Sequence, residues 1–190
     1  QEPSQEEDRP PETPDPNLRE TLFYFPDESR QLLIPVRIFI VWEEGIAQAT
    51  LRYCMEGQMP QKAAALGLAP LLPAGTDILG LSVRDGLARV DFSREFLTYA
   101  PEDEAVLMNG LTYTLTEFPT IDQVEIMVEN AVCELPGDAS AVQPFTREFG
   151  INLEVDENVE EFSDTQRIVL YFLYTSGEQV FDVPVSRVIN

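Results

Sequence analysis

The sequence contains no histidine and only two cysteines, Cys54 and Cys133. Nucleophilic triads and most zinc sites use histidine or a reactive cysteine as base or ligand, so the common versions of both are excluded. Two widely separated cysteines form neither a metal motif nor a disulfide framework. We expect each to be a small buried hydrophobic residue, with a single disulfide between them as the alternative. The sequence predicts no metal or cofactor site.

Long apolar runs are also missing. The longest candidate, Leu32 to Trp42, is interrupted by Pro35 and Arg37, whereas a membrane helix needs about 18 apolar residues. The polar, proline-rich stretch that begins at Gln1 is no signal peptide. If the protein is exported, we expect its targeting segment to have been removed from this sequence.

Basic residues are scarce. The sequence has 12 Lys and Arg and 34 Asp and Glu, which gives a net charge of -22. Phosphate binding needs Lys and Arg, so nucleic acid and anionic lipid surfaces are poor partners. The ten glycines are scattered in turns and form no phosphate-binding loop. The acidic excess favours solubility and does not identify a partner.

Composition and periodicity divide the chain into four parts. Residues 1–17 are acidic and proline-rich and cannot bury enough surface to fold, which predicts a disordered tether. Residues 18–131 are predicted to form one domain. Residues 132–165 are interpreted as an acidic linker, and residues 166–190 as a β-hairpin.

The predicted domain alternates strands and helices. Apolar spacing predicts strands at 21–25, 32–40, 77–84, 87–92 and 121–128, helices at 43–56 and 102–118, and a short helical turn at 63–68. Asp85-Gly86 suits a two-residue type I′ hairpin turn. The pattern predicts an α+β fold, in which two helices pack on one face of a small mixed sheet, plus the C-terminal hairpin.

The C-terminal hairpin resembles the start of the domain. A gapless alignment that places Pro184 on Pro35 also pairs aromatic and aliphatic residues: Phe23 with Phe172, Phe25 with Tyr174, Ile34 with Val183 and Val36 with Val185. Such self-similarity is typical of tandem domains. A lone hairpin is marginal in water. We therefore expect residues 168–189 to dock on the first domain or to pair with another chain, with a fragmentary chain as the alternative.

An ordered set of segments between residue 20 and about residue 131 resembles the GerM family, whose members carry tandem copies of a domain called GerMN. The matching segments are Leu22-Phe23-Tyr24-Phe25, Ile34-Pro35-Val36, Pro73-Ala74-Gly75-Thr76, Val83 to Ser93, Thr114 to Pro119 and Val124 to Val128. The family strand usually ends in Asp-Gly. Glu129-Asn130 takes that place here and should still turn.

This resemblance implies a bacterial lipoprotein of an endospore former, acting in sporulation and germination at the envelope between mother cell and forespore. The GerMN domain is similar to the ring-building modules of secretion-like assemblies, which implies scaffolding around a transenvelope channel. Its partners would be proteins, in a channel complex or by self-assembly. Membrane attachment would be only through a lipidated cysteine that is absent from this sequence.

Interface hot spots favour aromatic residues. The candidate interface residues are Trp42, Tyr99, Phe172 and Tyr174. Burial in the core is the alternative for Trp42.

The enzymatic alternative is a peptidoglycan-directed hydrolase or carbohydrate binder. It would use carboxylates alone, from Asp91, Glu95, Glu117 and Asp122. The structural alternative for Asp91 and Ser93 is that they cap the segment that follows their strand. For Glu117, the alternative is simple exposure at the end of its helix. Residues 154–164 are acidic but lack the ligand pattern of a calcium loop. The prediction is a non-enzymatic protein-interaction protein.

Overall fold

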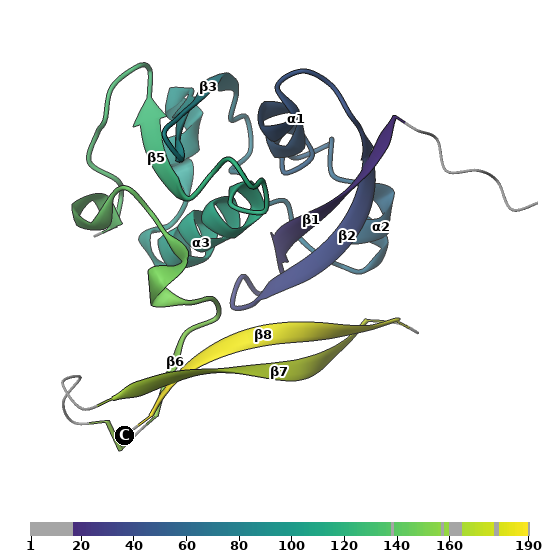
Figure 1. Ribbon diagram of the computed structural model, residues 1–190, viewed down its shortest axis with the longest axis vertical. Helices are drawn as coiled ribbons and strands as arrows, with labels where there is room; N and C mark the ends of the chain where they lie inside the picture. Colours follow the sequence, from purple (N-terminus) through teal and green to yellow (C-terminus); the bar gives the residue numbers. More distant parts are fainter. Residues whose placement is uncertain (1–16, 138, 157, 160–164, 177–178, 190) are drawn as a thin grey trace, which may run out of the picture.

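The computed structural model describes residues 17–137, 139–156, 158–159, 165–176 and 179–189. Apart from Asn17, the expected tether lies outside these ranges. Helix α3 (Glu104–Leu115) lies at the centre of the main body, with one small sheet on either side of it, and a third sheet lies below (Figure 1). The structure confirms the predicted α+β class.

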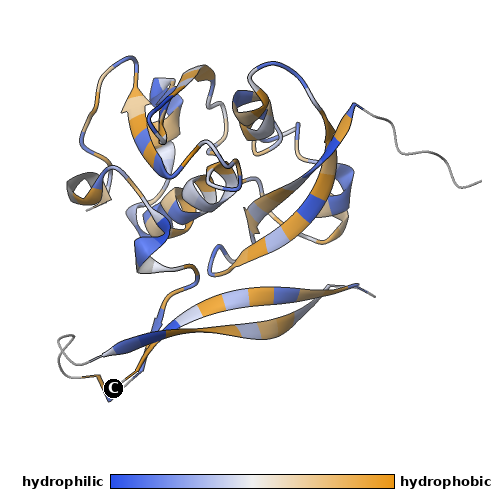
Figure 2. Cartoon of the chain, viewed as in Figure 1, coloured by the Kyte–Doolittle hydropathy of each residue, from blue (hydrophilic) through white to orange (hydrophobic). Residues whose placement is uncertain are grey.

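Strands β1 (Leu18–Pro26) and β2 (Leu33–Val41) form an antiparallel hairpin. Side chains of a strand alternate between two faces, and Figure 2 shows this alternation of hydropathy along β2. The inner face is buried and consists of Phe23, Phe25, Ile34, Val36, Ile38 and Ile40. Burying one such side chain stabilises the fold by about 1.5–3 kcal/mol.

Strands β3 (Ile78–Arg84), β4 (Leu87–Phe92) and β5 (Gln123–Val128) form the second sheet, in the order β3-β4-β5. The turn between β3 and β4 has φ of 50° at Asp85 and 80° at Gly86, which confirms the predicted type I′ connection. Glu129 and Asn130 also have positive φ, of 51° and 66°, so the expected turn after β5 is present.

Two sheets replace the single mixed sheet expected from the sequence. Helix α3 lies against the free edge of β1, where Thr114 Oγ1 accepts the N–H of Tyr24 at 3.1 Å. The helix therefore uses one outward donor of β1, and among the described residues β1 pairs with β2 alone. Gly110 of α3 permits the close approach of Leu71 and Leu33, since a Cβ there would collide with Leu71 and press on Leu33.

The other helices are shorter than predicted: α1 spans Ile46–Arg52 and α2 spans Gln61–Ala65. Helix α1 ends before a series of turns. Further along the chain, β4 is followed by a 3-10 segment, η1 (Arg94–Thr98). A second one, η2 (Pro101–Asp103), leads into α3, which therefore starts at Glu104.

The segment expected to be a linker, residues 132–165, is in part a structural component of the first domain. Its elements are η3 (Ala139–Val142), η4 (Arg147–Phe149) and β6 (Glu154–Val155). Leu135, Phe145 and Ile151 are buried in the core. Phe145 also exchanges two backbone hydrogen bonds with Val124 of β5, at 2.7 and 2.9 Å. The linker interpretation is thereby corrected for this stretch.

Strands β7 (Gln166–Ser176) and β8 (Gln179–Ile189) form the C-terminal hairpin, in a sheet of order β6-β8-β7. Tyr171 lies opposite Pro184, as Tyr24 lies opposite Pro35 in the first hairpin. The gapless alignment instead places Leu173 on Tyr24, so the first strand of the hairpin is shifted by two residues relative to that alignment. A shift of two leaves each side chain on the same face, so the resemblance between the hairpins remains.

Candidate protein-interaction surface

Trp42 follows the end of β2 and is 56% exposed. Phe39 and Val41, on the same strand, are 62% and 58% exposed. Period-two alternation places both on the outer face of the hairpin, away from the buried Ile38 and Ile40. The end of β2 therefore presents an apolar surface to solvent.

Tyr99, the second candidate, is half-buried between η1 and η2. Its hydroxyl donates to Glu104 Oε2 at 2.7 Å, and its ring meets Phe96 edge to face. The same Glu104 carboxylate accepts backbone N–H groups of Gly137 and Ala139. Burial, with the bond to Glu104, raises the pKa of the Tyr99 phenol far above its usual value. Tyr99 thus holds the loops together in the fold.

Phe172 and Tyr174 lie on one face of β7, where Phe172 is 47% exposed and Tyr174 packs against the core. The opposite face carries two residues that the sequence interpretation missed, Tyr171 and Leu173, which are 70% and 73% exposed. In the described part of the chain, β7 pairs with β8 along one edge only. A signal for this edge exists in the sequence, because Ile168 to Thr175 contains no charged residue.

The two hairpins are joined through Asn152. Its Oδ1 accepts the N–H of Leu33 on β2 at 2.7 Å, and its Nδ2 donates to the Leu33 carbonyl at 3.0 Å. The same Nδ2 donates to the carbonyl of Pro184 on β8 at 2.9 Å. Asn152 has a φ of 50°, a conformation that Asn tolerates better than most residues.

Ser186 completes the junction. Its backbone N–H donates to the Ile151 carbonyl at 2.8 Å, and its Oγ accepts the Ile151 N–H at 2.9 Å. A Cβ at Gly150 would collide with that hydroxyl, so glycine is required beside it. Together with Asn152, these bonds fix β8 to the first domain.

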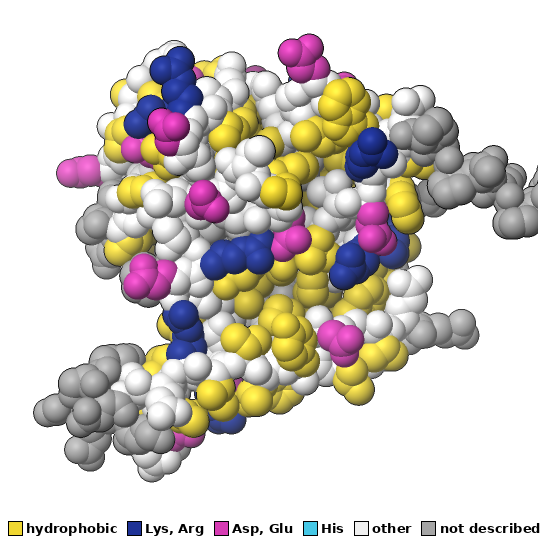
Figure 3. Space-filling view, in the orientation of Figure 1, with side chains coloured by type: hydrophobic (Ala, Val, Ile, Leu, Met, Phe, Trp, Pro, Cys, Tyr) yellow, Lys and Arg dark blue, Asp and Glu magenta, His cyan; other side chains and the backbone are white. Residues whose placement is uncertain are grey.

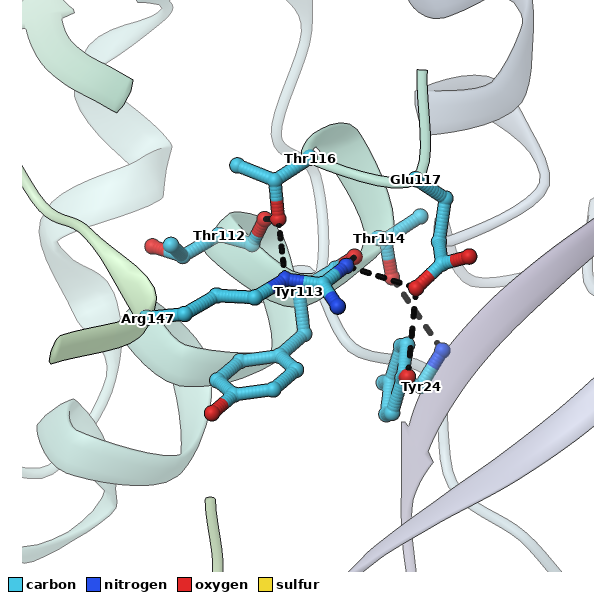
Figure 4. Close-up of polar contacts among 7 residues, drawn as sticks. All are labelled: Tyr24, Thr112, Tyr113, Thr114, Thr116, Glu117 and Arg147. Carbon is cyan, nitrogen blue, oxygen red and sulfur yellow. Dashed lines mark hydrogen bonds and ion pairs between the residues drawn. The ribbon is translucent and has the colours of Figure 1, made fainter. Parts of the chain in front are cut away.

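A polar cluster at the end of α3 connects residues 132–165, the segment expected to be a linker, to β1 (Figure 4). Arg147 donates to Thr116 Oγ1 at 2.6 Å, to the Tyr113 carbonyl at 2.8 Å and to Glu117 Oε1 at 2.6 Å. Its guanidinium also lies 4.6 Å from the centre of the Tyr113 ring. Tyr24 donates its hydroxyl to the same Glu117 oxygen at 3.3 Å. The pKa of Tyr24 is raised to about 12, mainly by burial and in second place by the negative charge of Glu117.

Three of the four carboxylates considered for hydrolysis, those of Asp91, Glu95 and Glu117, have structural partners. Asp91 accepts the Asn130 N–H at 2.9 Å, and Glu117 forms the ion pair with Arg147. Asp122 lies at the Asp85-Gly86 turn, where a Cβ on Gly86 would meet its carboxylate. A hydrogen bond with Ser93 lowers the pKa of Glu95.

The capping interpretation needs correction. Ser93 Oγ accepts the Asp77 N–H at 3.0 Å, and the side chain makes no cap on η1. Asp91 likewise ties down the turn after β5 instead of capping a helix. No group of three potential metal ligands occurs among the described residues.

Both cysteines are free thiols, so the alternative of a disulfide between them is not realised. Cys54 is buried in the core, as expected, and burial raises its pKa to about 12. Cys133 is half-buried, and burial raises its pKa as well.

Comparison with known proteins identifies the fold and the family. The family model described as "Germane: Sporulation and spore germination" matches residues 22–134. The chain is 32% identical over 149 residues to the spore germination protein GerM of Bacillus subtilis. The aligned residues make up 77% of this chain and 40% of that protein. It therefore spans about two fifths of that relative's length.

Two solved structures of B. subtilis GerM are similar as well. The tandem GerMN domains match with a TM-score of 0.77 at 26% identity, over 91% of this chain and 61% of that one. The first GerMN domain matches with a TM-score of 0.51 at 28% identity, over 60% of this chain and 84% of that one. With the family model covering more than half of its residues, the chain belongs to the Germane family of sporulation and spore germination proteins.

Proposed function

We propose that this chain is a non-enzymatic protein-interaction and scaffolding component of the sporulation and germination machinery. The edge strand β7 carries the proposal. Its outer backbone groups have no strand partner among the described residues, and with the exposed Tyr171 and Leu173 they form a long, uncharged apolar edge. Such an edge is a template for another polypeptide, and soluble proteins normally cover or charge it.

The domain organisation follows the same proposal. Residues 18–131 would form a GerMN domain, completed by buried residues of 132–165, and residues 166–190 would begin a second GerMN domain. The shared pairing of tyrosine with proline, Tyr24 with Pro35 and Tyr171 with Pro184, supports this division. The match to tandem GerMN domains over 91% of the chain also supports it.

We further propose an extracytoplasmic location, with attachment to the cell or forespore envelope through a lipid anchor outside this sequence. The spore germination protein GerM, as a relative, favours this location. None of the described helices is long and apolar enough to cross a membrane. The acidic residues 1–17 would connect this anchor to strand β1.

A cross-linking experiment tests the interaction. The full chain, carrying a photoreactive phenylalanine analogue in place of Leu173, would be expressed in sporulating cells. We expect a covalent adduct with another protein at this position and none with the analogue at the exposed Arg94, which lies on η1. Equal adduct formation at both positions, or none at position 173, would contradict the proposal.

The enzymatic alternative is tested separately with purified peptidoglycan. We expect no release of sugar fragments above the buffer background, because Asp91, Glu95 and Glu117 are engaged by structural partners. Saturable release that is lost in Asp122→Asn would establish a hydrolase instead.

A further inference from the structure

The junction at Asn152 leaves a groove between the two hairpins, because β2 and β8 are held together there and diverge beyond it. The groove has a volume of about 490 Å³. Its lining comes from both hairpins and α2: Leu22, Tyr24, Pro35, Arg37, Lys62, Tyr171, Val180, Phe181, Asp182 and Pro184. Apolar side chains gather in the region between the main body and the C-terminal hairpin (Figure 3).

The walls of this groove do not suit an added β-strand. Backbone groups directed away from the partner strand recur at every second residue. On β2 these positions include Pro35, which has no N–H, and Arg37, whose carbonyl already accepts Lys62 Nζ at 2.9 Å. On β8 they include Pro184, whose carbonyl is bound by Asn152. A continuous ladder cannot form along either wall.

The same walls suit a polyproline helix. Each has a tyrosine directly opposite a proline, the largely buried Tyr24 with Pro35 on one side and the exposed Tyr171 with Pro184 on the other. Aromatic-lined grooves bind proline-rich segments in this conformation, which needs no backbone ladder.

The groove extends to Trp42. A second hollow of about 310 Å³ shares Leu22 and Arg37 with the first and is also lined by Arg19 and Trp42. The backbone N–H of Trp42 donates to the Asn17 carbonyl at 2.7 Å. The far end of the groove therefore lies where residues 1–16 join β1.

The charge of the groove differs from that of the rest of the chain. Its two hollows contain three basic residues, Arg19, Arg37 and Lys62, and three acidic ones, Glu20, Glu117 and Asp182. In the whole chain, acidic residues outnumber basic ones by 34 to 12. Lys62 is the only lysine, and among the described residues its ammonium has no carboxylate within ion-pair distance. An acidic ligand meets less repulsion here than elsewhere on the surface.

We propose that this groove binds residues 1–16 of the same chain as an extended polyproline segment, with a carboxylate against Lys62. The segment contains five prolines, which match the aromatic lining, and six Asp or Glu, which match the positive charge of Lys62. Sixteen residues reach about 50 Å in this conformation. A nine-residue strand such as β1 spans about 30 Å. The segment is therefore long enough to turn back at Asn17 and follow the groove to Tyr171.

Proteolysis of the full chain tests this docking. A glutamate-specific protease cleaves after Glu6, Glu7 and Glu12, and a docked segment is cleaved only when it opens. We expect cleavage to be about threefold slower, or more, in the wild-type chain than in Lys62→Glu. Arg84→Glu, a matched charge reversal on β3 outside the groove, should cleave at the wild-type rate. The single Trp42 should emit at longer wavelength in Lys62→Glu than in the other two chains.

Two results would overturn the proposal. Equal cleavage rates in the three chains would show that the segment does not bind the groove. Protection that increases with protein concentration would show that the groove takes the segment of a neighbouring copy instead of its own.

Discussion

Asn152 binds both backbone groups of Leu33, although the two residues are 119 positions apart in the chain. Its amide occupies the place that a neighbouring strand would take on the edge of β2. The additional bond to the Pro184 carbonyl joins the same side chain to β8. One side chain therefore sets how the C-terminal hairpin lies against the first domain, and with it the groove between them.

Removal of this amide should loosen the C-terminal hairpin. Asn152→Ala loses three hydrogen bonds and places alanine at a positive φ, so we expect a loss of about 2–4 kcal/mol in the free energy of unfolding. Asn152→Asp is the matched control, because it keeps the backbone conformation and the acceptor for Leu33 N–H but loses the two donated bonds.

Urea unfolding would measure both free energies, and hydrogen exchange would measure the opening of β8. We expect the wild type to be the most stable, followed by Asn152→Asp and then Asn152→Ala, with faster exchange in β8 of both variants. Unchanged exchange in β8 of Asn152→Ala would show that other contacts hold the hairpin.

The pKa of Tyr24 predicts how stability depends on alkaline pH. The folded pKa is about 12, above the unfolded value of about 10. The neutral phenol is therefore favoured by folding, and its contribution is complete below pH 10 and lost as the pH rises from 10 towards 12. Thermal unfolding between pH 8 and pH 11.5 should show a steeper decline for the wild type than for Tyr24→Phe. Parallel curves would mean that Tyr24 ionises normally in the folded protein.

Local signals in the sequence predicted local structure well. Asp85-Gly86 predicts its turn because both residues adopt positive φ easily. In the replacement Glu129-Asn130 only the asparagine is a residue that favours positive φ, and the turn still forms. The strand patterns around these turns follow from period-two burial. Such features depend on residues only a few positions apart, so the sequence displays them directly.

Long-range contacts could not be predicted in the same way. Leu135, Phe145 and Ile151 are isolated apolar residues without periodicity, so their burial was missed and the stretch was interpreted as a linker. Arg147 likewise gives no local sign that it will bind Glu117. For the candidate surface, Trp42 and Phe172 are exposed, whereas Tyr99 is occupied by Glu104 and Tyr174 packs on the core.

The two thiols should differ sharply in reactivity. Cys54 is fully buried and its pKa is about 12, so the reactive thiolate is scarce in the folded protein. A colorimetric disulfide reagent at pH 8 should modify one thiol quickly, and the second only after unfolding in denaturant. Cys133→Ser should abolish the fast phase. A fast phase that persists in Cys133→Ser would place Cys54 at the surface.

The proposed function depends most directly on β7 as a binding edge, and the mass of the chain in solution tests this edge. Light scattering over a concentration series would compare the wild type with Leu173→Glu, which puts a charge on the exposed face, and with Arg94→Glu as a control. We predict that the masses of the wild type and the control rise above 21.4 kDa with concentration, while Leu173→Glu stays at that mass. A constant mass of 21.4 kDa for all three chains would contradict the account.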